Sequence, residues 1–232
     1  LGIDLCDDYS QISCFSSRMT EPEPVYYQPE DENKKENVLI PMVVCKKKGK
    51  DEWLIGEEAC RTALFNDGTT VDKLVKMIHD DKFATIEGVR YSAGELMRRY
   101  LEKLLLLPKE KYGTDEICSV VFTVQTLDGR FIDCLVRTAE ECGIDRSAVH
   151  VVSHTESFVY HTISQRKEVW ANLTRLFDFT DVGLHYYEMK VTRGCVPQMI
   201  EASHEKMQEG FRLDVLDNPN GARLGDTILT SC

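Results

Sequence analysis

The chain has 232 residues, of which 42% are hydrophobic, so it is long enough and apolar enough to bury a core. Its 28 Lys and Arg residues against 39 Asp and Glu residues give a formal net charge of −11 at pH 7. A surface this acidic repels nucleic acid and anionic membranes, so neither is predicted as a partner. The predicted partner is a protein of unknown identity, and homo-oligomerisation stays open.

The nine cysteines do not form a recognisable disulfide or metal-binding pattern. Their number is odd, no two stand at CxxC spacing, and several lie inside apolar runs. We therefore interpret them as reduced, small hydrophobic residues. No apolar stretch approaches the length of a transmembrane helix, and no signal peptide is visible. Together these features predict a cytoplasmic protein.

The first half of the chain mixes extended and helical patterns. The clearest helix begins at Ser92, where Ser92-x-x-Glu95 forms a capping box before apolar residues at helical spacing. The other predicted elements are two strands within 2–16 joined by a turn at Asp7-Asp8, an exposed loop at 21–37, a hairpin from 38–45 and 52–55 around a lysine-rich turn, and helices at 56–65 and 71–78.

The second half alternates strands and helices. A second capping box, Ser153-x-x-Glu156, opens a predicted helix directly after a strand. The remaining predicted elements are strands at 118–124, 149–152 and 173–179, a helix at 128–142, and a strand pair at 184–192 and 196–203. This alternation predicts an α/β domain whose sheet contains some parallel pairs.

The opening residues 2–10 read Gly-Ile-Asp-Leu-Cys-Asp-Asp-Tyr-Ser. This segment resembles the first phosphate-binding loop of the actin and heat-shock-chaperone ATPase superfamily, whose usual form is Gly-Ile-Asp-Leu-Gly-Thr-Thr-Tyr-Ser and which joins the first two strands. The matching residues are Gly2, Asp4, Tyr9 and Ser10, whereas Cys6 replaces the glycine and Asp7 and Asp8 replace the threonines.

Further segments follow in the order of that family. Residues 53–59 resemble a chaperone strand running into Ile-Gly-x-x-Ala, and residues 120–124 resemble its Thr-Val-Pro strand. Residues 151–155 stand where the family has a strand before Asn-Glu-Pro-Thr, and residues 176–183 resemble the second phosphate loop, Phe-Asp-Leu-Gly-Gly-Gly-Thr. No single motif is specific, but the set is collinear over nearly the whole chain. The chain thus resembles an uncharacterised bacterial branch of the superfamily.

The resemblance implies a ribonuclease-H-like (actin-like ATPase) subdomain with a small α/β insertion subdomain. In these terms residues 1–205 are expected to form the N-terminal lobe of the ATPase domain, with the insertion at roughly 22–90. Residues 206–232 are expected to begin a C-terminal lobe that is otherwise missing.

The resemblance also implies a nucleotide cleft lined by both loops, with ATP and magnesium as cofactors or with no cofactor at all. Asp4 and Asp178 are the implied magnesium ligands, acting through water. The implied cleft residues are Asp4, Cys6, Asp7, Asp8, Tyr9, Asp178, Thr180, Asp181 and Gly183. Three of these, Asp7, Asp8 and Asp181, would place carboxylates beside phosphates, which requires compensation by magnesium or by basic residues. Solvated turn residues are the alternative interpretation of Asp7 and Asp8.

The candidates for catalysis are Asp4, His154 and Glu156, although no catalytic residue is assigned. His154 stands at the position of the family's catalytic glutamate, and Glu156 lies two residues later. A role in the capping box is the favoured interpretation of Glu156, and a surface histidine is the alternative for His154. Lys73 and Lys76 stand near the position of the chaperones' catalytic lysine, where solvated helix-face lysines are the alternative.

Three functions remain open, and whether the chain is an enzyme is undecided. The leading prediction is a degenerate protein of this fold that acts as a scaffold or regulatory interaction module with weak or no ATP hydrolysis. The alternatives are a divergent, active ATPase and a subunit of an actin-like polymer. The loop at 21–37 and the lysine turn at 46–50 are the predicted partner contacts. A zinc site is not predicted, because the histidines at 150, 154 and 161 form no ligand motif.

Overall fold

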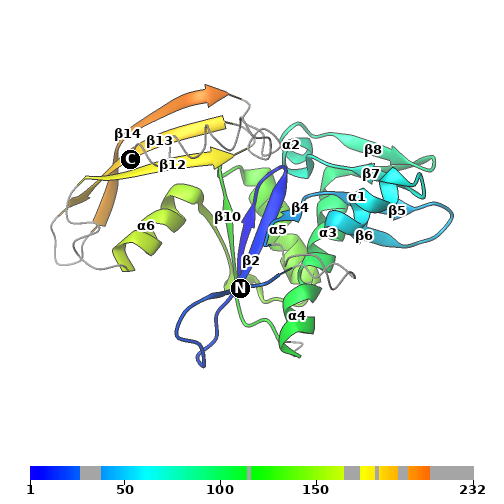
Figure 1. Cartoon of the computed structure of the whole chain (residues 1–232), viewed down its shortest axis with the longest axis horizontal. Helices are drawn as coiled ribbons and strands as arrows, with labels where there is room; N and C mark the ends of the chain where they lie inside the picture. Colours follow the sequence, from blue (N-terminus) through cyan, green and yellow to red (C-terminus); the bar gives the residue numbers. More distant parts are fainter. Residues whose placement is uncertain (27–37, 114–115, 165–172, 181–182, 193–197, 210–232) are drawn as a thin grey trace. The chain divides into compact units, whose positions relative to one another are not determined.

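The computed structural model describes residues 1–26, 38–113, 116–164, 173–180, 183–192 and 198–209. Within these ranges the chain forms two compact units, residues 1–152 (unit 1) and 153–232 (unit 2). Strands and helices are mixed along the chain, which confirms the predicted α/β class (Figure 1). The lobe boundary predicted between residues 205 and 206 falls inside a strand of unit 2 and stays a prediction.

Unit 1 is built on a sheet whose strands run in the order β11-β10-β1-β2-β3, with β4 also paired to β2. β1 pairs parallel with β10 and antiparallel with β2. The strands of this sheet are β1 (Gly2–Leu5), β2 (Tyr9–Cys14), β3 (Glu23–Pro24), β4 (Ile40–Pro41), β10 (Val120–Val124) and β11 (Val149–Ser153). Alternate residues of the central strands are buried, such as Ile3 and Leu5 on β1, so one face of the sheet packs in the main core.

Between β4 and α3 the chain builds a smaller layer inside the predicted insertion range. Its strands form a three-stranded antiparallel sheet, β6-β5-β7, and a separate hairpin, β8–β9. The elements are β5 (Val44–Lys47), β6 (Trp53–Ile55), α1 (Gly56–Leu64), β7 (Gly68–Val71), α2 (Leu74–His79), β8 (Phe83–Ile86) and β9 (Val89–Ser92). The helix predicted at 71–78 is thus shorter, because β7 continues to Val71 and pairs with β5.

The two longest described helices of unit 1 are α3 (Ala93–Leu104) and α5 (Gly129–Glu141), and the short helix α4 (Leu106–Tyr112) follows α3. α3 begins with the predicted capping box, in which both Ser92–Glu95 hydrogen bonds are present. Asp128 caps α5 by accepting a hydrogen bond from the Phe131 N–H (3.0 Å). Both helices bury an apolar stripe in the main core, including Tyr100 on α3 and Leu135 on α5. A 3₁₀ turn, η1 (Arg146–Ala148), follows α5.

Unit 2 contains one described helix and one antiparallel sheet. The helix is α6 (His154–Ser164), and the strands are β12 (Thr174–Thr180), β13 (Gly183–Thr192) and β14 (Gln198–Glu209) in the order β12-β13-β14. The predicted strand pair at 184–192 and 196–203 is confirmed as β13 and β14, with β14 extending further.

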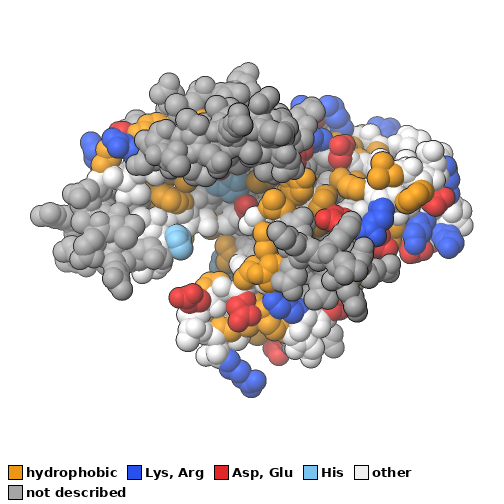
Figure 2. Space-filling view, viewed as in Figure 1, with side chains coloured by type: hydrophobic (Ala, Val, Ile, Leu, Met, Phe, Trp, Pro, Cys, Tyr) orange, Lys and Arg blue, Asp and Glu red, His pale blue; other side chains and the backbone are white. Residues whose placement is uncertain are grey.

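The lysine turn lies at the tip of the β5–β6 hairpin. Figure 2 shows Lys and Arg side chains gathered at the right-hand end of the view, where Figure 1 places this tip. Lys46 pairs with Glu87 (2.7 Å) and Lys47 with Glu52 (2.7 Å). Lys48 and Lys50 are exposed. About half of the predicted basic turn is therefore neutralised within the hairpin layer.

Candidate functional site

The loop between β1 and β2 is a tight connection at the carboxyl end of β1. The Cys6 N–H donates to the carbonyl of Tyr9 (3.0 Å), and the carbonyl of Asp8 accepts from the Met42 N–H (2.9 Å). The backbone N–H of Cys6 is therefore used to close the turn. The predicted position of the loop between the first two strands is confirmed.

Asp7 acts as a cap for a helix that lies far away in the sequence. Its side chain is buried (6% exposed), and its Oδ1 accepts a hydrogen bond from the Lys76 N–H (2.9 Å). α2 has no side-chain cap of its own, because Lys73 at its N-cap position offers no oxygen. The carboxylate of Asp7 thus satisfies a backbone donor in the first turn of α2.

Asp8 forms an ion pair with Lys73, the residue that precedes α2. Both side chains are partly buried, with 20% and 30% of their surface exposed. The interpretation of Asp7 and Asp8 as solvated turn residues is therefore wrong: both carboxylates contact the start of α2. The alternative of a solvated Lys73 is wrong for the same reason, because this lysine compensates the charge of the loop.

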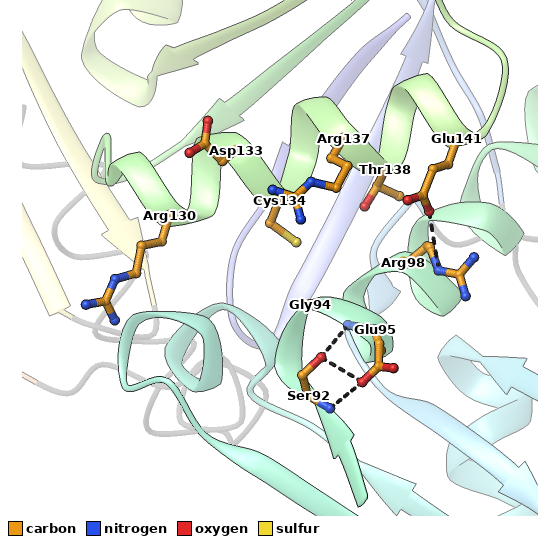
Figure 3. Close-up of a pocket in the computed structure, with 10 residues that line it drawn as sticks. All are labelled: Ser92, Gly94, Glu95, Arg98, Arg130, Asp133, Cys134, Arg137, Thr138 and Glu141. Carbon is orange, nitrogen blue, oxygen red and sulfur yellow. Dashed lines mark hydrogen bonds and ion pairs between the residues drawn. The ribbon is translucent and has the colours of Figure 1, made fainter.

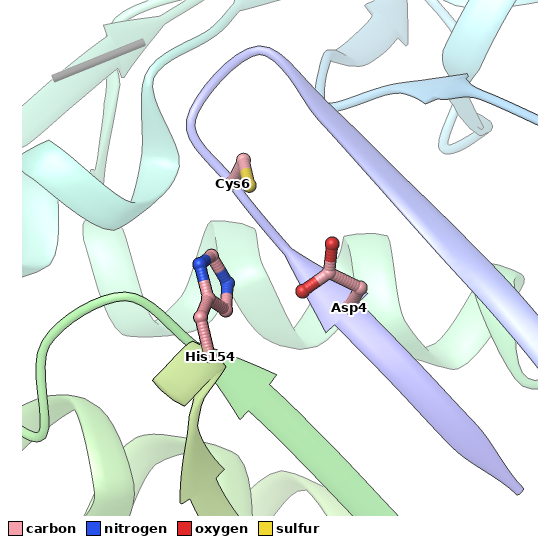
Figure 4. A group of neighbouring side chains, drawn as sticks. All are labelled: Asp4, Cys6 and His154. Atoms are coloured by element: carbon pink, nitrogen blue, oxygen red, sulfur yellow. The ribbon is translucent and has the colours of Figure 1, made fainter. Parts of the chain in front are cut away.

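Asp4 is held in place by the neighbouring parallel strand. The Thr123 hydroxyl donates to Asp4 Oδ1 (2.7 Å), as the register of β1 against β10 places the two residues opposite each other. Figure 4 shows Asp4 on β1 and Cys6 in the loop that follows. Tyr9 begins β2 and is paired with Pro41. Asp4 thus has a fixed carboxylate at the carboxyl end of the central strands.

In unit 2, His154 and Asp178 form a pair. His154 is the first residue of α6 and Asp178 lies in β12, and the His154 Nδ1–H donates to Asp178 Oδ2 over 3.2 Å. An ionised carboxylate only accepts, so this contact places the proton of a neutral ring on Nδ1. A histidine held by a carboxylate in this way is an oriented base or ligand. The pairing also engages one oxygen of Asp178, which is one of the two carboxylates implied as magnesium ligands.

Glu156 contributes to the start of α6. Its N–H donates to the Ser153 hydroxyl (3.1 Å), which is half of the predicted capping box, and its Oε1 accepts from the Tyr160 hydroxyl (3.2 Å). These contacts support a structural role for Glu156.

The second predicted phosphate loop is described only in part. Thr180 ends β12 and pairs with Gly183, which begins β13 with a φ of 140°. Asp181 lies outside the described residues. Three of the predicted cleft residues, Asp178, Thr180 and Gly183, are thus parts of one β-hairpin.

Sequence reasoning did not assign the two contacts that define these sites. The sequence placed Lys73 only near the position of a catalytic lysine. Its pairing with Asp8 joins residues that are 65 positions apart. The His154–Asp178 pair joins two candidates that had been given separate roles. A signal for the pairing of Asp8 with Lys73 was nevertheless present. The adjacent acids Asp7 and Asp8 need charge compensation, and lysines stand at the start of a predicted helix.

A family model described as "Family of unknown function (DUF5716) C-terminal" matches residues 26–232 of the chain. Among curated proteins, none matches. Within the residues that the structure describes, no helix is long and apolar enough to cross a membrane.

Proposed function

We propose that this chain, which belongs to the DUF5716 C-terminal family of unknown function, is a scaffold or regulatory interaction module on a degenerate actin-like ATPase fold, with weak or no ATP hydrolysis. The observation that carries the proposal is the contact of Asp7 and Asp8 with the start of α2.

The arrangement of unit 1 supports the ribonuclease-H-like part of the proposal. The first loop joins the first two strands, and β10 lies beside β1 and is followed by α5. β11 lies next to β10 and leads directly into α6, in the order of elements that the resemblance to the actin-like ATPase superfamily implies. The smaller sheet, β6-β5-β7, occurs in the chain between β4 and α3, where an insertion is expected.

The loop itself does not fit a bound triphosphate. Lys73 and the first turn of α2 are the groups beside the loop that attract an anion, and the carboxylates of Asp7 and Asp8 already engage both. An added phosphate would meet these carboxylates, and two like charges about 4 Å apart repel by about 1 kcal/mol in water and about 4 kcal/mol near a protein surface. We therefore derive no hydrolytic step through this loop.

One observation favours the second candidate, a divergent ATPase. Asp4 matches the acid with which the actin-like ATPase superfamily organises magnesium and its waters, and it is oriented by the Thr123 hydroxyl (2.7 Å). An oriented carboxylate is suited to hold a hydrated divalent cation. Asp4 therefore decides between the two candidates.

Calorimetric titration of magnesium-ATP into the folded protein tests the proposal. We expect no detectable heat at millimolar nucleotide. Removing the internal anion should release Lys73, so Asp8→Ala should gain weak binding of triphosphate. The double variant Asp8→Ala/Lys73→Ala should lose that gain. Asp51→Ala removes an exposed acid from the lysine turn and serves as the matched charge control.

Tight binding of magnesium-ATP by the unchanged protein, abolished in Asp4→Ala, would overturn the proposal and establish the ATPase. An equal gain in Asp8→Ala and Asp51→Ala would show that net charge, and not the engaged Lys73, limits anion binding.

A further inference from the structure

An open groove lies between helices α3 and α5 of unit 1. It has a volume of about 780 Å³, and Figure 3 shows its lining side chains projecting from both helices. Arg98 and Glu95 line it from α3, and Arg130, Asp133 and Arg137 line it from α5. The groove therefore carries charges of both signs, and its binding properties depend on which of them are already paired.

Two of the acidic groups in the groove are engaged within the chain. Glu95 Oε2 accepts hydrogen bonds from the Ser92 N–H and hydroxyl (both 2.7 Å), and these bonds lower the pKa of the Glu95 carboxyl below its ordinary value. Glu141 pairs with the Arg98 Nε over 3.5 Å. Asp133 is the remaining acid of the lining.

Two of the three arginines are not engaged. Arg130 and Arg137 are exposed, and neither forms a hydrogen bond or ion pair with any part of the chain that the structure describes. They lie seven residues apart on α5, which is about 10 Å along a helix with a rise of 1.5 Å per residue. Seven residues is close to two turns, so both guanidinium groups follow one side of the helix.

The floor of the groove is uncharged. Cys134 lies between the two arginines along α5, and burial raises the pKa of its thiol above the ordinary value, so it stays protonated at neutral pH. A protonated, partly buried thiol is a poor nucleophile. The groove is thus suited to binding through the arginine side chains and not to covalent chemistry at Cys134.

We propose that the α3–α5 groove binds an acidic peptide segment of a partner protein through Arg130 and Arg137. The peptide would place two carboxylates about 10 Å apart, which is about one turn, or three residues, of a polyproline-II chain, in which residues i and i+3 face the same side. Each guanidinium presents a planar fork of donors that matches a carboxylate. The inference rests on the proposed role as an interaction module, and it specifies the surface and the partner chemistry.

The charge pattern favours a peptide over a nucleic acid. Along α5 the lining alternates Arg130, Asp133, Arg137 and Glu141. A continuous polyanion would meet the acidic positions and a protein of net charge −11, whereas a peptide can alternate its charges with those of the groove.

Fluorescence anisotropy with a labelled peptide tests the proposal. The probe is a synthetic ten-residue peptide with glutamate at every third position, and its glutamine counterpart is the control probe. We expect the folded protein to bind the glutamate probe more tightly. The double variant Arg130→Gln/Arg137→Gln should weaken this binding by about fivefold or more, as expected for two exposed ionic contacts. Asp133→Asn should strengthen it by about twofold, because it removes the unengaged acid.

The matched control is Arg18→Gln/Lys103→Gln, which makes the same change of net charge at two exposed positions outside the groove and outside the lysine turn. Equal weakening in both double variants would overturn the assignment to the groove, and so would equal affinity for the two probes. The titrations are repeated with millimolar magnesium-ATP. Nucleotide binding that leaves probe affinity unchanged would refute the proposed function but not the peptide site. Equal affinity for the two probes, without nucleotide binding, would refute the peptide site but not the proposed function.

Discussion

Two charged regions of unit 1, the β1–β2 loop and the α3–α5 groove, differ in how their charges are compensated. In the loop, Asp7 caps α2 and Asp8 pairs with Lys73, so each carboxylate has an internal partner. In the groove, Arg130 and Arg137 have no ion-pair or hydrogen-bond partner within the described part of the chain. The β1–β2 loop resembles a ligand-binding motif in sequence, but its charges are already compensated within the chain, whereas those of the groove are not. Ligand binding is therefore expected at the groove.

Tyr100 connects the helix of the groove to the strand that follows the loop, so its removal should disturb both regions. The side chain is fully buried on α3, its hydroxyl lies 2.5 Å from the Ser10 hydroxyl, and it donates to the carbonyl of Ile40 (3.3 Å). We expect Tyr100→Ala to lower the free energy of unfolding by about 3–5 kcal/mol, in the range of large aromatic truncations.

Tyr100→Phe should lower the free energy of unfolding by about 1–3 kcal/mol, because Ser10 would lose its buried partner. Urea denaturation followed by circular dichroism measures both variants. Similar losses in the two would show that the hydroxyl, and not the ring, carries the contribution.

Burial also raises the pKa of Tyr100, so its contribution to stability is complete below about pH 10 and is lost as the pH rises further. The alkaline decline of stability should be shallower in Tyr100→Phe.

The cap provided by Asp7 is the next largest effect. Asp7→Ala should lower the free energy of unfolding by about 1–2 kcal/mol, because the Lys76 N–H would be left without its acceptor. Asp7→Asn keeps an acceptor oxygen and should lose less. Hydrogen exchange of the amides in α2 localises the effect, and faster exchange in α3 than in α2 would contradict it.

The capping box at the groove should contribute less, because both residues lie nearer the surface. Ser92→Ala should cost about 1 kcal/mol in the free energy of unfolding. Hydrogen bonds from Ser92 lower the pKa of Glu95, so its contribution is present above the ordinary carboxyl pKa of about 4.3 and is lost as the pH falls through the lower folded value. Acid titration of Glu95→Gln should show a shallower decline below about pH 4, and an identical acid limb would refute this.

The ion pair of Asp8 with Lys73 should have the smallest effect on stability. A double-mutant cycle of Asp8→Ala and Lys73→Ala should give a coupling of about 0.2–1 kcal/mol, since both side chains are partly exposed. High salt should reduce this coupling. A coupling that does not respond to salt would point to packing and not to charge. Because its expected contribution to stability is small, the pair should matter mainly for excluding anions from the loop.

Local patterns predicted most of the elements. The capping box appears at Ser92 as predicted, and the strand predicted at 118–124 appears as β10 (Val120–Val124), because capping hydrogen bonds and short apolar runs involve neighbouring residues. The hairpin of β8 and β9 was missed. Its signal was a two-residue turn at Glu87-Gly88, both with positive φ, which is the geometry that such hairpins require. α4 was also missed.

The candidate sites were predicted as sets of residues but not as contacts. Asp4 lies in a strand that was predicted, and Asp7 and Asp8 follow that strand directly, so their common location was predictable. Their partners were not, since Thr123 comes from a strand 119 residues away and Lys73 precedes a helix of the smaller layer. The same holds for the α3–α5 groove, whose lining combines two helices that are separated by more than twenty residues.

The sequence by itself determined the α/β class, the capped helices and the acidic substitutions in the first loop, because each depends on residue types at short spacing. Only the tertiary structure decided what those acids do. Pairing the β1–β2 loop with α2 requires the packed core that holds both elements, and that packing depends on contacts between distant residues. The same packing left Arg130 and Arg137 facing an open groove, which no local pattern of the chain could have indicated.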